Sequence, residues 1–161
     1  MAIEYHLDIK GVKGESGSTK HMEHIELHSW SWGASNPTSI SGSGMSAGKV
    51  SMSDLAFTKN VDKASPALLR LCVNGDHVDE ATLFCAKSTG GMNPEDFLHI
   101  VLKEVYVSSF QVGGSHGEDV GTESVSLTYG QIEYGYKVQQ KGGSLADAGT
   151  VKYDLIAREQ G

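Results

Sequence analysis

The sequence predicts a mainly β fold: an antiparallel β-barrel of two sheets, flanked by one short α-helix. Apolar and polar residues alternate with a period of two along most of the chain, which is typical of strands that bury one face. Glycine accounts for 20 of the 161 residues and gathers between the alternating segments, as expected for turns and loops. Start and stop signals typical of a helix flank one segment.

The composition predicts a single globular domain over residues 1–161, because 39% of the chain is hydrophobic and 20% is charged. The formal net charge of −7 argues against nucleic acid or an anionic membrane as the partner, since both require a basic face. No apolar stretch approaches the roughly 18 residues of a membrane span. The N-terminal residues MAIEYHLDIK lack the pattern of a secretory signal, so we expect the chain to fold in the cytoplasm and any export to proceed without a cleaved signal peptide.

The first half of the chain carries three predicted strands and two loops. Residues 3–9 alternate between apolar and polar side chains and form the first strand. A loop rich in glycine, serine and lysine covers residues 11–20, and a second strand covers about residues 21–33. Residues 34–48 (ASNPTSISGSGMSAG) are mostly small and are predicted to form a loop, which is long for a connection within a compact domain. A third strand runs over about residues 49–58.

One α-helix is predicted over about residues 66–74. Ser65 is placed to cap this helix, and Pro66 suits its first position, where the missing N–H has no partner to lose. Asn74–Gly75 is a typical stop. Because about nine residues are too few for an isolated helix, we expect packing against the sheet to hold it.

The second half of the chain alternates between strands and glycine-rich connections. Cys72 and Cys85 lie inside apolar runs and are predicted to be reduced, buried thiols. The predicted strands cover about residues 80–87, 97–112, 123–139 and 150–157, and the connections cover residues 88–93, 113–121 and 141–149.

Three predicted strands change the face on which their apolar residues lie. Because side chains alternate with a period of two, a strand can do this only at a bulge or where both of its faces are covered. Both explanations are open at each change, but three changes in one small domain favour a second chain that covers some outer faces. The changes separate Ile25 and Leu27 from Trp30 and Trp32, Val50 and Met52 from Leu55 and Phe57, and Val125, Leu127 and Tyr129 from Ile132, Tyr134 and Tyr136 around Gly130.

No motif in the sequence predicts a catalytic residue or a cofactor. The segment GMSAG, residues 44–48, matches the G-x-S-x-G pattern of serine hydrolases, whose nucleophile stands at a strand-to-helix turn. Here Ser46 lies in a Gly/Ser-rich segment that a predicted strand follows, so a serine hydrolase is a disfavoured alternative. The Gly48–Lys49 pair is too little for a phosphate-binding loop, because Val50 stands where a Ser or Thr would bind magnesium.

No metal site is predicted. His24, Glu26 and His28 share one face of the second strand, with His21 nearby, but three ligands at two-residue spacing converge poorly on one ion. We interpret them as residues of a solvated face. If that face is enclosed, clustered histidines would make assembly sensitive to pH.

Five segments stand out when the chain is read in order: IELHSWSWGASNP, KVSMSDLAFTKNVDKASPALLRLCVNGDH, LKEVYVSSFQV, ESVSLTYGQIEYGYKVQ and TVKYDLIA. Together they resemble the Hcp family, the haemolysin-coregulated proteins that form the inner tube of the bacterial type VI secretion system. The resemblance extends from Ile3 to Ala157. It implies a tube domain without enzymatic activity, whose hexameric rings stack inside a contractile sheath behind a spike protein, and whose lumen holds small effector proteins.

A ring requires a closed head-to-tail interface, in which one patch meets a different patch on the neighbour. The resemblance implies that residues 34–48 pack on neighbouring subunits, and we expect the outer faces of the strands that change face to contribute. The candidate interface residues are Trp30, Trp32, Asn36, Pro37, Phe57 and Tyr134.

Ser29 and Ser31 are the candidate lumen residues. They share a face with Ile25 and Leu27, so this strand is half apolar and half small and polar. Such a surface suits contact with varied cargo, although core packing at a bulge would account for the pattern equally well. A monomeric ligand-binding β-barrel is the remaining alternative, and it predicts one dominant apolar cavity and no rings.

Overall fold

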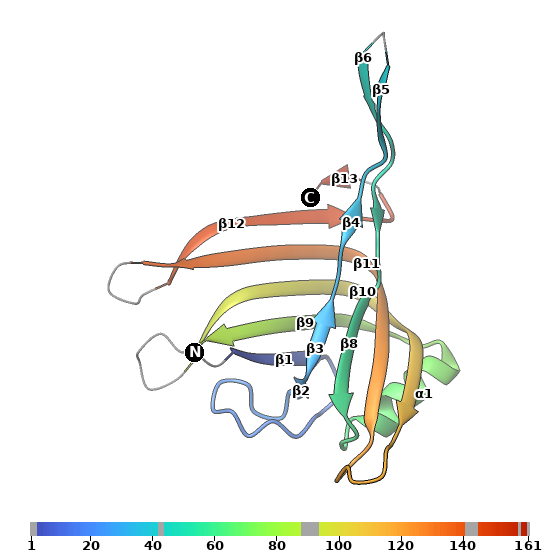
Figure 1. Cartoon of the computed structure of the whole chain (residues 1–161), viewed down its shortest axis with the longest axis vertical. Helices are drawn as coiled ribbons and strands as arrows, with labels where there is room; N and C mark the ends of the chain where they lie inside the picture. The colour runs from blue at the N-terminus through green and yellow to red at the C-terminus, as the bar shows by residue number, and fades with distance from the viewer. Residues whose placement is uncertain (1–2, 42–43, 88–93, 141–144, 158, 161) are drawn as a thin grey trace.

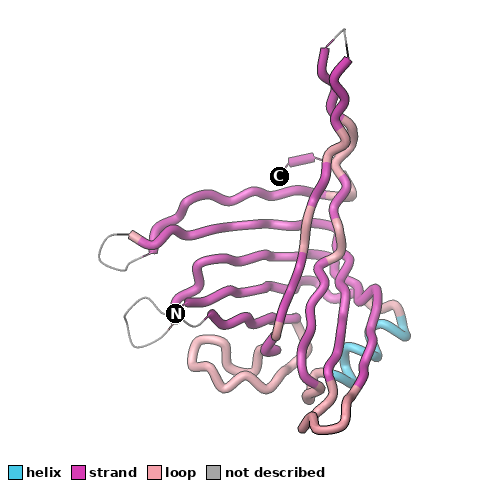
Figure 2. Tube along the Cα trace, viewed as in Figure 1, coloured by secondary structure: helices cyan, strands magenta, loops and turns pink. Residues whose placement is uncertain are grey.

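The computed structural model describes residues 3–41, 44–87, 94–140, 145–157 and 159–160. Within these ranges the protein is mainly β, with one α-helix, and the paired strands run antiparallel (Figures 1 and 2). This confirms the predicted fold class. The strands are β1 (Ile3–Ile9), β2 (Ile25–Leu27), β3 (Ser29–Ser31), β4 (Ala34–Ser35), β5 (Thr38–Ser41), β6 (Gly44–Ala47), β7 (Ser51–Met52), β8 (Leu55–Asn60), β9 (His77–Lys87), β10 (Glu95–Gly113), β11 (Thr122–Gln139), β12 (Leu145–Asp154) and β13 (Glu159–Gln160), and the helix is α1 (Ser65–Asn74).

A nine-stranded sheet forms the body of the molecule. Its strands follow the order β13-β12-β11-β10-β9-β1-β2, while β8 pairs with β11 and β3 pairs with β8. Figure 1 shows that the long strands β10 and β11 run side by side between β9 and β12 and then bend, so that the bent part of β11 runs beside β8. The pairing of the described residues is a branched path, so the expected barrel is present as a curled sheet and not as a hydrogen-bonded ring of strands.

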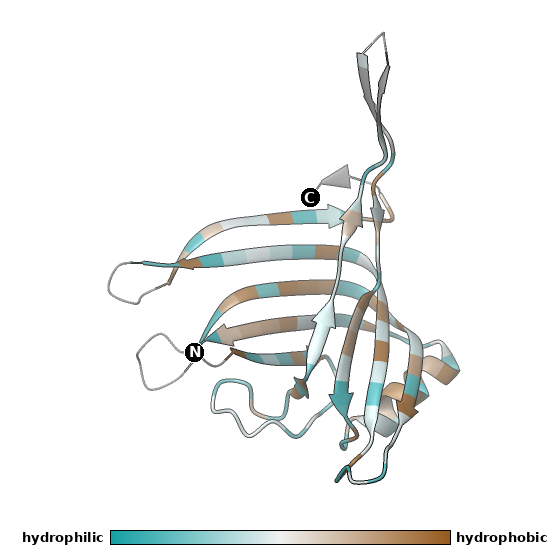
Figure 3. Cartoon of the chain, in the orientation of Figure 1, coloured by the Kyte–Doolittle hydropathy of each residue, from teal (hydrophilic) through white to brown (hydrophobic). Residues whose placement is uncertain are grey.

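The core fills the inside of the curl. Buried leucine, isoleucine and valine side chains come from β1, β2, β8, β9, β10 and β11, and Leu68 of α1 joins them. Figure 3 shows the resulting alternation of apolar and polar residues along the strands. The interior is therefore occupied by the chain's own side chains, which disfavours a ligand-binding barrel with a dominant cavity.

All three changes of face coincide with irregularities inside the chain. The first two fall between short strands, at His28 and at Ser53–Asp54, where the chain leaves one partner strand for another. The third falls at Gly130 of β11, opposite Glu104 of β10, whose φ is 55°. A change of partner or a bend therefore explains each change, and covering by a second chain is not needed.

Residues 34–48 are not a loop, which corrects the prediction. The described residues of this segment, 34–41 and 44–48, form most of a β-arm, defined here as residues 34–41 and 44–52, that projects from the body (Figure 1). β4 pairs with β7 near its base, and β5 pairs with β6 further out. Small, β-compatible residues such as Ser, Thr and Ile pair readily in an extended hairpin, so a composition typical of a loop also suits a ribbon.

The helix begins one residue earlier than predicted, at Ser65, and its cap differs. Ala64 is the N-cap residue and makes no side-chain cap. The Ser65 hydroxyl instead donates to the Glu123 carboxylate, 2.8 Å away, and accepts from the Asp62 N–H. The predicted stop is confirmed, because Gly75 has a φ of 69° and its N–H donates to the carbonyl of Leu71.

The boundaries of β1, β9, β10 and β11 agree with the prediction to within about three residues. The strand predicted at 21–33 is instead two short strands, β2 and β3, and the strand predicted at 49–58 is divided into β7 and β8, because the chain changes partner strand within each segment. β12 begins at Leu145, so the later part of the connection predicted at 141–149 is strand. The predicted connection at 88–93 and residues 141–144 lie outside the described residues.

Candidate assembly surfaces and serine face

Ser29 and Ser31 lie on a face of the curled sheet where their cross-strand neighbours are small or uncharged polar side chains. The two serines are exposed, and Ser29 Oγ lies 2.6 Å from Thr58 Oγ1. Their cross-strand partners continue across β8, β11 and β10 in two rows, and the surface between the rows is grooved. We call these rows the serine face: Ser29, Thr58, Ser124 and Gln111 in one row, and Ser31, Ala56, Ser126 and Ser109 in the other.

Trp30 points the other way, as alternation requires. It is half-buried against the core and meets Tyr5 edge-to-face, with ring centroids 6.3 Å apart. Phe57, its cross-strand partner, is 2% exposed. The expectation that Phe57 forms part of an outer contact is therefore wrong, because its side chain is buried in the chain's own core.

Trp32 anchors the base of the β-arm. Its Nε1 donates to Tyr129 Oη, which in turn donates to the carbonyl of Ser53 at 2.8 Å. The Ser53 N–H donates to the Gly33 carbonyl and the Gly33 N–H donates to Ser53 Oγ, so both strands of the arm are held where they leave the body. Burial raises the pKa of Tyr129, which keeps the phenol a neutral donor. Tyr134 stacks on Trp32, with centroids 6.2 Å apart.

Asn36 and Pro37 lie in the β-arm, where both are exposed. Asn36 borders a groove between the base of the arm and Tyr153 of β12. The Pro37 carbonyl accepts from the Gly48 N–H at 2.7 Å, and a Cβ at Gly48 would lie 2.6 Å from that carbonyl oxygen. Only glycine allows this close approach of the two strands.

The core face continues past the core along β11 and β12 and becomes exposed. Tyr134 and Tyr136 lie opposite the buried Ile100 and Leu98, yet each tyrosine is 38% exposed. Val151, opposite Tyr134 on β12, is also exposed. This exposed apolar margin is the kind of surface that marks a protein interface.

Sequence reasoning missed a buried ionic cluster. Lys59 is 0% exposed and pairs with Glu123 across β8 and β11. The Lys59 ammonium also lies 2.9 Å from an Asp62 oxygen and 3.3 Å from Ser65 Oγ. The signal was available, because Lys59 and Glu123 occupy positions with the inward parity of their strands.

The predicted histidine face is divided in two by the fold. His28 is exposed and its Nε2 lies 2.7 Å from Asn60 Oδ1, whereas the half-buried His24 and the buried His21 form a cluster with the buried His6 of β1. The sequence reasoning did not include His6. Among the described residues no group of three or more His, Cys, Asp or Glu side chains is arranged to hold a metal ion.

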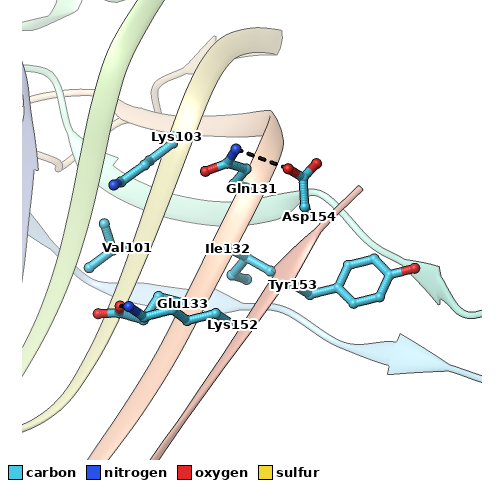
Figure 4. Close-up of a pocket in the computed structure, with 8 residues that line it drawn as sticks. All are labelled: Val101, Lys103, Gln131, Ile132, Glu133, Lys152, Tyr153 and Asp154. Carbon is cyan, nitrogen blue, oxygen red and sulfur yellow. Dashed lines mark hydrogen bonds and ion pairs between the residues drawn. The ribbon is translucent and has the colours of Figure 1, made fainter. Parts of the chain in front are cut away.

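In the described hairpin of β5 and β6, the strand that carries Ser46 pairs with no histidine or carboxylate residue. Figure 4 shows a pocket over β10, β11 and β12, where four of the polar side chains form two pairs. Gln131 donates to Asp154 at 3.1 Å, and Lys152 lies 3.4 Å from Glu133. Ser46 lies in β6, opposite Ser39 in a hairpin and away from any strand-to-helix turn. The hydrolase alternative is therefore not favoured.

The two cysteines are free thiols, as predicted. Cys85 is buried, and burial raises the pKa of its thiol to about 12. Cys72 of α1 is only half-buried. Across the part of the chain that the structure describes, we find no helix with the length and apolar character needed to cross a membrane.

The fold and these surfaces define a structural class of protein: a β domain with a filled core, a projecting arm and an uncharged serine face. A family model described as "Type VI secretion system effector, Hcp" matches residues 6–136. The protein hcp1 of Pseudomonas aeruginosa is 45% identical over 99% of this chain and 98% of its own length.

Two solved structures support the same conclusion. One, described as a type six secretion system protein, has a TM-score of 0.92 at 28% identity and covers 99% of this chain and 100% of its own. The crystal structure of Hcp1 from Salmonella typhimurium has a TM-score of 0.80 at 32% identity and covers 99% of each chain. The chain belongs to the Hcp family and is a structural subunit of the type VI secretion tube.

Proposed function

We propose that residues 1–161 act as one tube domain, whose copies close into hexameric rings that stack into the secretion tube. The observation that carries this proposal is the β-arm, which is held rigidly at its base and projects beyond the chain's own core. A projecting arm and a separate exposed apolar margin are two different patches, as a head-to-tail interface requires.

Trp32, Asn36, Pro37 and Tyr134 are the interface residues we propose from this arrangement. Asn36 and Pro37 would contact a neighbour directly from the arm. Tyr134 would contribute the exposed part of its ring, while its other face stacks on Trp32. Trp30 contributes through its half-buried indole, and we propose a smaller role for it because the core already covers part of the ring.

The serine face would line the lumen of the ring. Eight small or uncharged side chains in two rows offer many weak hydrogen-bonding groups and no charged or large apolar anchor. Such a surface suits small effector proteins of varied sequence, because it contacts cargo without a strong preference. A net charge of −7 favours protein cargo over nucleic acid.

The protein would act without catalysis. We propose that it is assembled in the cytoplasm and expelled as a tube within a contractile sheath and behind a spike protein, without a cleaved signal peptide and without insertion into a membrane. The sheath, the spike protein and the export route are proposed for this chain because it belongs to the Hcp family.

Ring formation is tested by native mass spectrometry and negative-stain imaging of the purified chain. We expect particles of six times the 17.2 kDa chain. Tyr134→Asp should shift the population to monomers, because it places a charge in the apolar margin, whereas Lys152→Asp, on the opposite face of the same region, should leave rings intact. A monodisperse monomer at micromolar concentration would contradict the proposal.

The lumen assignment is tested by Ser31→Glu. Rings should form as before, but retention of a co-expressed effector should change, because the charge enters the uncharged serine face. Gln139→Glu introduces the same charge at an exposed position at the end of β11 and is the matched control. Equal retention by both variants would refute the assignment, and so would loss of the ring with Ser31→Glu.

A further inference from the structure

Residues 11–24, which we call the strap, fold back across the sheet between β1 and β2 instead of connecting them directly. Their own hydrogen bonds hold them in shape: the Gly14 N–H donates to the Glu23 carbonyl at 2.7 Å, and the Ser16 N–H donates to the His24 carbonyl at 3.0 Å. His21, within the strap, is 4% exposed. The strap therefore covers part of the face of β1 and β9 that is turned away from the core.

Three histidines and one phenylalanine form the contact between the strap and this face. His6 of β1 stacks on His21 with centroids 4.9 Å apart, and Phe84 of β9 lies 4.6 Å from the His21 ring. His24, the last residue of the strap, also stacks on Phe84, with ring centroids 5.8 Å apart. His6 and Phe84 are cross-strand partners, so a single site on two strands carries the contact.

The hydrogen bonding of this cluster suits neutral imidazoles. His21 Nδ1 lies 3.2 Å from His24 Nδ1, and such a bond needs one N–H and one free lone pair. If both rings were fully protonated, two N–H groups would face each other. His6 Nδ1 is buried and has no hydrogen-bond partner among the described residues.

The charges around the cluster can balance one added proton more easily than several. Asp96 Oδ1 lies 2.8 Å from His21 Nε2, but Lys20 already lies 3.4 Å from the same carboxylate. Asp8 is 3.6 Å from His24 Nε2 and is half exposed. The groups that face the cluster are Glu4 and Asp8 on β1, Glu26 on β2, Asp96 and His99 on β10, and Lys13, Lys20 and Glu23 on the strap, while β9 contributes the uncharged Phe84.

We propose that the cluster of His6, His21, His24 and Phe84 is an acid-sensitive latch, which holds the strap on β1 and β9 at neutral pH and releases it when the histidines take up protons. Release would expose Phe84 and the outer face of these two strands. This inference does not depend on ring formation, because every residue it uses lies within one chain.

The direction of the pH effect follows from which form the closed strap favours. Burial, and then the neighbouring His21, lower the pKa of His6, while Glu4 and Asp96 oppose this effect only partly. Burial also lowers the pKa of His24 against the opposing effect of Asp8. When the strap is released, the pKa values of His6 and His24 return to about 6.5, so below that pH the released state binds more protons than the closed state. The latch is therefore closed above pH of about 6.5 and weakens as the pH falls.

Hydrogen–deuterium exchange of the full-length chain, read by mass spectrometry on peptic fragments, tests the latch. The protection factors of fragments from residues 11–24, corrected for intrinsic exchange, should fall at least about tenfold when the pH is lowered from about 7.5 to about 5.0. A difference of one pKa unit in one group between the closed and released states corresponds to a tenfold change in the equilibrium between them. Fragments from β9 should keep their protection.

His6→Phe identifies the groups responsible. The phenyl ring keeps the stack on His21 but cannot take up a proton, so the loss of protection at low pH should shrink several-fold. His77→Phe removes an exposed histidine at the far end of β9, outside the cluster, and should leave the response unchanged. Wild-type strap fragments with the same protection at both pH values would overturn the proposal, and so would simultaneous loss in strap and β9 fragments, which would indicate global unfolding. If His6→Phe does not fold, the wild-type comparison decides alone.

Discussion

Replacing Lys59 by methionine should strongly destabilise the protein. Lys59 is completely buried, and its ammonium bridges the carboxylates of Glu123 and Asp62 while donating to the Asn60 carbonyl at 2.9 Å. Methionine fills a similar volume but leaves two buried or nearly buried carboxylates without their cation. The only compensation comes from donors that each carboxylate already has: Ser65 Oγ for Glu123, and the Ala64 N–H for Asp62.

The size of the effect follows from the desolvation of the remaining charges. Removing one partner of a buried ion pair costs about 3–5 kcal/mol, whereas replacing both partners by apolar residues is often close to neutral. Lys59→Met should therefore lower the free energy of unfolding by about 3–5 kcal/mol, a large share of the roughly 5–15 kcal/mol typical of a domain. The double variant Lys59→Met/Glu123→Leu should regain about half of that loss, because Asp62 still lacks its cation.

Urea unfolding followed by tryptophan fluorescence measures these changes, since Trp30 and Trp32 are both partly buried against the core. Each variant should be measured at two protein concentrations, because assembly stabilises the folded chain by mass action. Lys152→Met is the matched control: it removes a lysine from an exposed pair with Glu133 and should change stability by about 0–1 kcal/mol.

Two results would refute this reasoning. A loss below about 1 kcal/mol for Lys59→Met would mean that water reaches the cluster and screens the carboxylates. A double variant less stable than the single variant would mean that Lys59 and Glu123 are stabilising independently of each other, and not as a pair.

Three further outcomes are expected. Tyr129→Phe should lower the free energy of unfolding by about 1–3 kcal/mol, because the Trp32 N–H then loses its buried acceptor. The same variant should weaken ring assembly, because the base of the arm is held less firmly. Rings as stable as those of the wild type would contradict this expected effect on assembly. In the native protein a thiol reagent at pH of about 8 should modify Cys72 and spare Cys85, whose pKa is raised to about 12; equal rates would contradict burial of Cys85. Gly14→Ala should expose the strap to exchange even at neutral pH, because its Cβ would lie 2.5 Å from a backbone carbonyl oxygen, and unchanged protection would show that the strap is not packed as described.

Local patterns in the sequence predicted the features that depend on local physics. Alternation located the long strands β9, β10 and β11 to within a few residues, because each of them buries one face along most of its length. Gly75 was identified as the helix stop because glycine adopts without strain the left-handed backbone conformation that ends many helices, and Gly75 has that conformation. The family resemblance rested on order and composition of segments, which are also properties of the sequence alone.

Predictions failed where the outcome depended on which segments meet. The composition of residues 34–48 is equally compatible with a loop and with a β-ribbon. The segment forms a ribbon because β4 pairs with β7 and β5 pairs with β6. Ser65 had the right position for a cap, but the buried Glu123 competes for its hydroxyl. The changes of face looked like evidence for a second chain until the bend at Gly130 and the change of strand partners explained them.

The amino-acid sequence by itself determined that this protein is a β domain with one short helix, because periodicity, capping and turn chemistry act over a few residues. Only the tertiary structure decided that Lys59 meets Glu123, 64 residues away, and that His6 meets His21 under the strap. Burial changes what a charge or an imidazole can do, and burial is created by contacts between distant segments. His21 and His24, which the sequence predicted on a solvated face, thus join a cluster between the strap and β1, while Lys59 and Glu123 form an ion pair in the core.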